Sequence, residues 1–303
     1  MEALPVLRAQ HLSKTIGRRL IVDDVSIEVR RGEILGFLGP NGAGKTTTIR
    51  MLVGLIRPSG GTVEIAGHDL RSDFEAAMRK VGCIVEGPDL YRFMTGRENL
   101  EHFARMIGEV RPEEIEAVAA TVDMAHRLDE KVRTYSLGMR QRLGIAQALL
   151  GGPDLLILDE PANGLDPAGI REMRELLRGL ARERDLGILI SSHLLGEVEQ
   201  MCDRVAIIHR GRLLTSGPVS ELLTRTDGWL MQVDRADAAA SIMRDRGLEV
   251  ARNDGWLEFQ AGRELIPNLI EALVREGIAI TSVQPRKRTL EERFLDETHG
   301  ETV

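Results

Sequence analysis

Residues 39–47 of this chain have the sequence GPNGAGKTT. It contains the pattern Gly-x-x-x-x-Gly-Lys-Thr, which is typical of a phosphate-binding loop between a strand and a helix. Glycines let such a backbone curl until successive N–H groups point at phosphate oxygens, and the helix that follows directs its positive end there. We therefore expect a nucleotide to bind at Gly39, Pro40, Asn41, Gly42, Ala43, Gly44, Lys45, Thr46 and Thr47.

Two side chains of this loop have expected roles of their own. Lys45 supplies a movable positive charge for the β- and γ-phosphates, and the Thr46 hydroxyl can ligate Mg²⁺. The alternative is a glycine-rich turn that only joins a strand to a helix. Four further segments typical of phosphate chemistry follow in order, and they favour the nucleotide site: Glu86, YSLGMRQR at 135–142, LLILDEP at 155–161 and ISSH at 190–193.

Short apolar runs alternate with helical patterns around these segments. Residues 95–130 are charged, alanine-rich and helical in period, and they predict an inserted helical subdomain at about residues 95–150. Residues 168–183 and 194–201 also predict helices. Strands that alternate with helices predict an α/β domain with a largely parallel sheet. Buried strands are predicted at residues 33–38, 62–65, 81–85, 155–158, 188–190 and 205–208.

Two acidic residues follow the apolar run 155–158 directly. A buried strand delivers them to the sheet edge where ligands bind in open α/β sheets. Asp159 can hold Mg²⁺ there, directly or through its water, and Glu160 is our candidate base for the attacking water. The alternative is two solvated acids at a strand end. His193 follows the next strand, and we expect it to contact the γ-phosphate, although a lone histidine is more often structural.

The pattern changes near residues 220–227. The following segments predict the order strand, helix, two strands, helix, strand, which is compatible with a small α+β ferredoxin-like fold. We therefore divide the chain into domains at residues 1–222 and 223–303. An amphipathic helix is predicted at residues 289–298. The segments of the small fold are residues 229–233, 236–246, a strand pair around 253–255, 264–276 and 278–283.

Composition sets broader limits. The 303 residues carry a formal net charge of −7, so no nucleic-acid partner is expected. No apolar run approaches the roughly 20 residues that span a bilayer, and the first residues do not read as a secretory signal. Cys83 and Cys202 lie outside any metal-ligand spacing and are expected to be reduced thiols. A soluble cytoplasmic chain is expected.

The five segments together resemble the ATP-binding subunit of an ABC transporter, over roughly residues 5–222. In that family, YSLGM at 135–139 corresponds to the signature sequence, and the resemblance implies that Ser136 and Gly138 contact the γ-phosphate held by a second copy. The resemblance also implies that Asp166 contributes to the nucleotide site, because the matching segment of the family crosses the dimer interface. The resemblance implies an ATP hydrolase in which two head-to-tail copies enclose two ATP molecules, with a membrane permease at the inner face of the membrane as partner.

Three positions depart from the usual family pattern. Ile16 stands where an aromatic residue normally stacks on adenine, and Met139 replaces the signature glutamine. Glu86 replaces a glutamine, and because a carboxylate is the stronger ligand for Mg²⁺, we expect Glu86 to hold the metal together with Thr46 and Asp159. The same exchange is a feature of subfamilies that resemble bacitracin and lantibiotic self-protection exporters, so export of an antibiotic, peptide or drug is our leading hypothesis.

Several alternatives stay open at this point. The chain could serve ion or lipid export, could be a binding module with weak hydrolysis, or could be a relative that acts on ribosomes or DNA. The acidic composition disfavours the last of these, since phosphate contacts supply most nucleic-acid affinity. The C-terminal domain could be a regulatory or dimer-stabilising module, or it could be a packing domain that binds no ligand.

Overall fold

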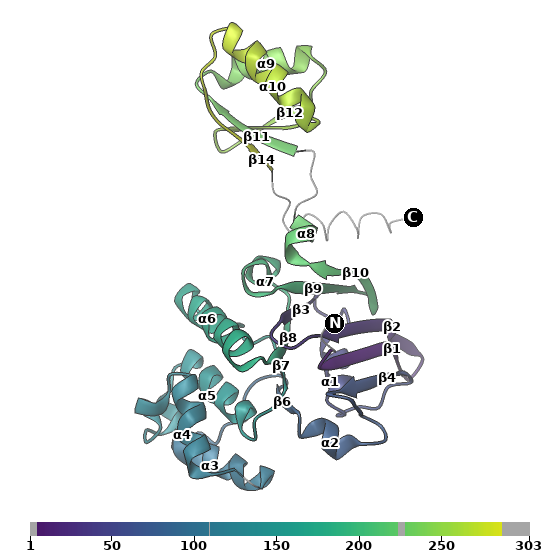
Figure 1. The fold of residues 1–303 in the computed structure, drawn as a ribbon, viewed down its shortest axis with the longest axis vertical. Coiled ribbons are helices and arrows are strands. Elements are labelled where there is room, and N and C mark those ends of the chain that lie inside the picture. Colours follow the sequence, from purple (N-terminus) through teal and green to yellow (C-terminus); the bar gives the residue numbers. More distant parts are fainter. Residues whose placement is uncertain (1–4, 109, 224–227, 287–303) are drawn as a thin grey trace. The chain divides into compact units, whose positions relative to one another are not determined.

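The computed structural model describes residues 5–108, 110–223 and 228–286 (Figure 1). The chain divides into two compact units, of which one ends at Val219 and the other begins at Ser220. This division falls at the start of α8 (Val219–Leu223), whereas the predicted limits at 222 and 223 fall near its end. Those predicted limits stay a prediction.

A six-stranded sheet forms the centre of the larger unit, in the order β10-β9-β3-β8-β7-β6. Neighbouring strands from β9 to β6 run parallel, and β10 alone pairs antiparallel. Every residue of β3 and β7 is buried, as the apolar runs predict. The predicted α/β fold is therefore confirmed. The strands are β3 (Ile34–Leu38), β6 (Val81–Ile84), β7 (Leu155–Asp159), β8 (Gly187–Ser192), β9 (Arg204–His209) and β10 (Arg212–Pro218).

A second, antiparallel sheet has the order β2-β1-β4-β5. Helix α1 (Lys45–Leu52) contacts both sheets through β1, β2 and β7. Its buried Ile49, Met51 and Leu52 join apolar residues of the two sheets in one core. The phosphate-loop helix is thereby fixed by packing on two sides. The strands are β1 (Leu7–Ile16), β2 (Arg19–Val29), β4 (Gly60–Ile65) and β5 (His68–Asp69).

The inserted helices follow β6 in the chain. They are α3 (Gly96–Ile107), α4 (Pro112–Thr121) and α5 (Leu137–Leu149), and they pack against one another, as predicted. Thr95 and Glu98 form a capping box that fixes the start of α3. The short η1 (Ala125–Arg127) and η2 (Val132–Thr134) connect α4 to α5.

Three more helices complete the larger unit. They are α2 (Phe74–Met78), α6 (Pro167–Arg184) and α7 (Leu195–Met201). The last two correspond to the helices predicted at 168–183 and 194–201, and they contact each other and the large sheet. Among the described residues, no helix combines the length and apolar character that crossing a bilayer requires.

The smaller unit is an antiparallel sheet of order β12-β13-β11-β14 with α9 and α10 packed into its core. This strand order is that of a ferredoxin-like fold, so the prediction is confirmed. The helix predicted at 289–298 lies outside the described residues. The elements are β11 (Gly228–Val233), α9 (Ala236–Asp245), β12 (Val250–Asn253), β13 (Trp256–Gln260), η3 (Arg263–Leu265), α10 (Ile266–Arg275) and β14 (Ile280–Pro285).

Close approach of β6 to α5 generates a stability prediction. A Cβ added at Gly82 would lie 2.0 Å from the backbone oxygen of Ala148. Gly82→Ala should therefore lower the free energy of unfolding by roughly 1–3 kcal/mol, because the strand and helix must separate. Chemical denaturation measures this change.

Gly179 provides the matched control inside α6, since a Cβ there meets no atom within 4 Å. Gly179→Ala should raise stability by about 0.5–1 kcal/mol through helix propensity. Equal stability of Gly82→Ala and the wild-type protein would contradict the packing described here.

Candidate functional site

The carboxyl ends of three parallel strands meet at one edge of the large sheet. Asp159 at the end of β7 pairs with Ser191 of β8, and Leu38 at the end of β3 pairs with Ser192. The phosphate loop follows β3, and Glu160 follows β7. Parallel pairing therefore gathers segments that lie more than a hundred residues apart in the sequence, at the edge where ligands bind in such sheets.

The loop curls tightly before α1. Gly42 and Gly44 have φ values of +80° and +108°, which favour glycine. A Cβ at Gly39 would lie 2.3 Å from the backbone oxygen of Ile208. Lys45, which is only 5% exposed, donates to the backbone oxygen of Gly39 at 2.7 Å. The Lys45 side chain therefore folds back, so that its positive charge lies against the loop.

Asp159 is held by two hydroxyl groups. The Thr46 hydroxyl donates to its Oδ2 atom at 3.2 Å, and the Ser191 hydroxyl donates to its Oδ1 atom. Ser191 is fully buried and also accepts a hydrogen bond of 3.0 Å from the backbone N–H of Glu160. One serine therefore orients both acids, and the predicted site residues did not include it.

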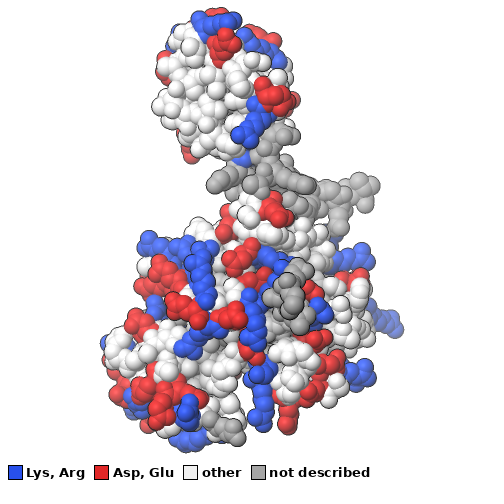
Figure 2. Space-filling model, viewed as in Figure 1, with Lys and Arg blue, Asp and Glu red and all other residues white. Residues whose placement is uncertain are grey.

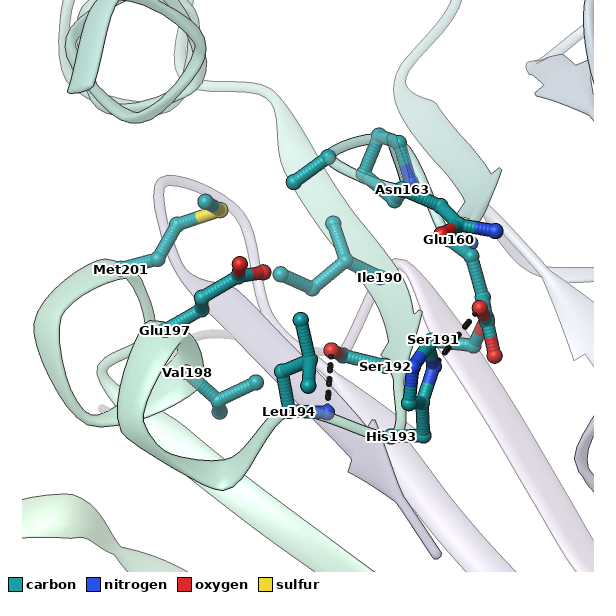
Figure 3. A pocket seen from close by; sticks show the side chains of 12 residues that line it. Glu160, Asn163, Ile190, Ser191, Ser192, His193, Leu194, Glu197, Val198 and Met201 are labelled. Carbon is teal, nitrogen blue, oxygen red and sulfur yellow. Dashed lines mark hydrogen bonds and ion pairs between the residues drawn. The ribbon is translucent and has the colours of Figure 1, made fainter. Parts of the chain in front are cut away.

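Glu160 has a left-handed backbone with φ of +50°. Such a conformation costs a non-glycine residue about 1–3 kcal/mol, and it often occurs at functional sites. The Glu160 carboxylate has two partners, Lys45 and His193, of which Figure 3 shows His193. Its Oε1 atom is 3.6 Å from the Lys45 amine, and its Oε2 atom is 2.8 Å from His193 Nδ1.

A hollow of about 320 Å³ is bordered by Thr46, Asp159 and Glu160. Thr46 and Asp159 already place hydroxyl and carboxylate oxygens together there, and Mg²⁺ prefers such ligands. Among the described residues, no group of three or more His, Cys, Asp and Glu could hold a metal. A cation here would need phosphate and water as additional ligands, as is usual for Mg²⁺. The lining residues are Thr46, Glu86, Gly87, Gln141, Asp159, Glu160 and Asn163.

Glu86 lines this hollow, but it forms an ion pair with a residue that does not line it. Its carboxylate binds the guanidinium of Arg50 on α1. Its backbone is left-handed, with φ of +65°. The structure therefore brings Glu86 near the predicted metal ligands Thr46 and Asp159 without a hydrogen bond or ion pair to them among the described residues.

A second, narrow pocket of about 10 Å³ is lined by Glu160, His193 and residues of α7 (Figure 3). Glu197 lines it together with apolar residues such as Ile190 and Met201. Burial raises the pKa of the Glu197 carboxyl; the charge of His193 opposes this shift and that of Glu160 adds to it. The pocket is too small for a ligand beyond water.

Ser136, Gly138 and Asp166 lie together at the starts of two helices. Ser136 accepts a hydrogen bond of 3.2 Å from the backbone N–H of Met139 and caps α5, while Asp166 caps α6. A Cβ at Gly138 would lie 3.7 Å from Leu165, next to Asp166. Among the described residues, no hydrogen bond or ion pair joins Ser136 to the phosphate loop. Among the described residues, Ser136, Gly138 and Asp166 also do not line the hollow beside Thr46 and Asp159.

Ile16 is 54% exposed at the end of β1, where it pairs with Arg19 of β2. The same hairpin contacts the phosphate loop, because a Cβ at Gly44 would lie 3.0 Å from the backbone oxygen of Ile21. Ile16 thus presents an apolar but non-aromatic surface on the hairpin beside the loop.

Two further residues of the hollow, Gln141 and Asn163, are also outside the predicted set. Both stand within motifs that the sequence contains, YSLGMRQR and the segment after Glu160. Their position within or next to these motifs was the sequence signal that could have identified them as site residues. Ser191 had a comparable signal, since it stands two residues before His193 at a strand end.

The comparisons with known proteins agree on one family. Residues 22–163 match the family described as ABC transporter. The uncharacterized ABC transporter ATP-binding protein YhcH of Bacillus subtilis is 47% identical, over 98% of this chain and 97% of its own. The bacitracin transport ATP-binding protein BcrA of Bacillus licheniformis is 42% identical, over 98% and 99%. The lantibiotic transport ATP-binding protein SrtF of Streptococcus pyogenes is 39% identical, over 69% and 89%.

Solved structures show the same relationship. The structure of an ATP-binding subunit of an ABC transporter has a TM-score of 0.62 and 29% identity, and it covers 89% of this chain and 99% of that one. Sequence relatives thus match along nearly the whole chain, and the loop, Asp159, Glu160 and His193 lie at one sheet edge. The chain belongs to the ABC transporter family, as an ATP-binding subunit that hydrolyses ATP to drive transport.

Proposed function

We propose that this chain powers the export of an antibiotic, peptide or drug, as one of two identical ATPase subunits bound to a membrane permease. The observation that carries the proposal is the position of Glu160, whose carboxylate lies between Lys45 and His193 and one residue from Asp159. This arrangement places a base, Glu160, next to a cation that can bind phosphate, and Glu160 and Asp159 both line the hollow.

The loop and its lysine would bind the triphosphate. Backbone N–H groups of residues 39–47 would contact phosphate oxygens, and Lys45 would exchange the backbone oxygen of Gly39 for the β- and γ-phosphates. Thr46 and Asp159 would hold Mg²⁺, whose charge offsets that of the phosphates. Glu86, at the rim of the hollow, would act on the cation through water.

Glu160 and His193 would carry the hydrolytic step. The Glu160 carboxylate would orient a water molecule and accept its proton as the water oxygen bonds to the γ-phosphorus. The bond from this phosphorus to the β–γ bridging oxygen breaks, and ADP and phosphate form. His193 would contact the γ-phosphate and hold Glu160 in place through its Nδ1 atom.

A second copy would complete each site. Ser136 and Gly138 head α5, where a hydroxyl and free N–H groups suit an anion, yet the described structure gives Ser136 no bond to its own loop. We infer a head-to-tail pair in which these residues meet the γ-phosphate on the other copy, with Asp166 at the interface. Ile16 would contact adenine through apolar surface alone, without stacking.

The permease would bind at an aromatic surface that follows Glu86 in the chain, made of Tyr91, Phe93, His102, Phe103 and Met106. Phe93 and Met106 are 67% and 71% exposed. The surface is rigidly mounted, because the buried Asn99 bonds both the N–H and the backbone oxygen of Tyr91. Exposed apolar side chains of this kind suit a protein partner, and the permease would place the chain at the inner face of the membrane.

The substrate class comes from relatives and not from this chain. Two of the three sequence relatives named above are described as bacitracin and lantibiotic transport proteins, and the bacitracin protein matches along almost the entire chain. On the face in Figure 2, Lys and Arg alternate with Asp and Glu over the larger unit, which gives a polyanion no broad basic surface there. Antibiotic or peptide export is therefore the best-supported function, ahead of ion or lipid export and of nucleic-acid partners.

The role of Glu160 generates a direct kinetic prediction. Glu160→Gln removes the base and keeps the shape, so steady-state ATP hydrolysis should fall roughly 100-fold or more, with ATP affinity retained. Phosphate release and nucleotide titration measure the two effects. Glu175→Gln, an exposed acid on α6, is the control and should hydrolyse ATP at the wild-type rate. An unchanged rate in Glu160→Gln would remove the catalytic assignment.

The aromatic surface generates a second prediction. Phe93→Ser should reduce co-purification of the chain with its permease and the bacitracin resistance of cells that express both, because apolar contact area is lost. ATP hydrolysis by the isolated chain should not change. Val274→Ser, at an apolar side chain of the smaller unit that is 55% exposed, is the matched control. Full permease binding by Phe93→Ser would place the permease elsewhere.

A further inference from the structure

We propose that Arg50 is a positioning residue that offsets the negative charge of Glu86, so that a triphosphate can enter a hollow already lined by carboxylates. This inference rests on the proposed function of the phosphate loop and deepens it. Arg50 has no role in the site described so far.

The first observation is the ion pair itself. The Arg50 guanidinium binds the Glu86 carboxylate across elements that stand 36 positions apart in the chain. The two side chains are 41% and 61% exposed, so water screens the pair and little stability depends on it. We therefore expect this ion pair to change the affinity for a charged ligand in the hollow more than it changes the stability of the fold.

The second observation is where the pair stands. Glu86 lines the same hollow as Asp159 and Glu160, so three carboxylates face the space that the phosphates would enter. Lys45 lies close to only one of them, Glu160, at 3.6 Å. Arg50 supplies the charge that offsets Glu86.

The third observation concerns geometry. Arg50 follows Lys45 by five positions on α1, which is roughly 7–8 Å along the helix axis. The offsetting charge is therefore carried by the helix whose first turn binds phosphate, and that helix is fixed in the core. Glu86 meets it from a left-handed backbone, with φ of +65°, next to Gly87 with φ of +123°. This turn after β6 directs the carboxylate to a defined position.

A competing explanation is that Arg50 attracts the phosphates directly. The two explanations differ in what Glu86 contributes. If Arg50 only offsets Glu86, removal of both charges should leave ATP affinity as it is in the wild-type chain. If Arg50 attracts phosphate itself, removal of both should weaken ATP as much as removal of Arg50 alone.

The test measures ATP affinity of the full chain for Arg50→Gln, Glu86→Gln and the double variant, with EDTA and then with Mg²⁺ and a non-hydrolysable ATP analogue. Arg50→Gln should weaken binding of Mg²⁺-free ATP by about 1.4- to 5-fold, the range of an exposed charge pair. The loss should be smaller with Mg²⁺, whose charge intervenes between Glu86 and phosphate. The double variant should return to wild-type affinity.

Unchanged affinity in Arg50→Gln, or a double variant as weak as Arg50→Gln, would overturn the inference. Arg8→Gln breaks another exposed ion pair, with Glu28, and should leave ATP affinity unchanged. Lys45→Met separates this inference from the proposed function. If Lys45→Met binds ATP like the wild-type chain, the loop assignment itself fails; if it loses ATP and Arg50→Gln does not, only the role of Arg50 fails.

Discussion

The pairing of β7 with β8 is the constraint on which the site depends. Because the strands are parallel and Asp159 pairs with Ser191, the polar residues at the ends of both strands lie at the same edge of the sheet. The buried Ser191 hydroxyl then bonds Asp159 and accepts the N–H of Glu160. A shift of the register by one residue would turn each side chain to the other face of the sheet and separate these groups.

The surrounding structure stabilises two unfavourable features of the site, namely the left-handed backbones and the carboxylates that line one hollow. Glu160 and Glu86 both have left-handed backbones, which non-glycine residues rarely adopt. Each carboxylate has a cationic partner from the phosphate-loop helix, Lys45 for Glu160 and Arg50 for Glu86. Since α1 is fixed between two sheets, these partners come from a rigid element. Two of the three carboxylates that line the hollow are thus paired with cations of α1, while Asp159 accepts hydrogen bonds from hydroxyl groups.

The sequence predicted most of this architecture, because buried strands and motif residues carry strong local signals. The apolar runs of β3 and β7 and the glycines of the loop are examples. Strand β1 was missed because register shifts between Ala9 and Lys14 interrupt its alternation. The pairing of Glu86 with Arg50 and the hydroxyl of Ser191 escaped prediction for another reason. Both depend on contacts between distant elements, which spacing along one chain does not reveal.

We propose that each ATP site is built from two copies, with Lys45 from one and Ser136 from the other. The most direct measurement mixes two inactive variants, Lys45→Ala and Ser136→Glu, and follows ATP hydrolysis. A mixed pair contains one site with an intact loop and an intact serine, so the account predicts hydrolysis well above that of either variant alone. Mixing without any gain, or a fully active Ser136→Glu variant by itself, would contradict it.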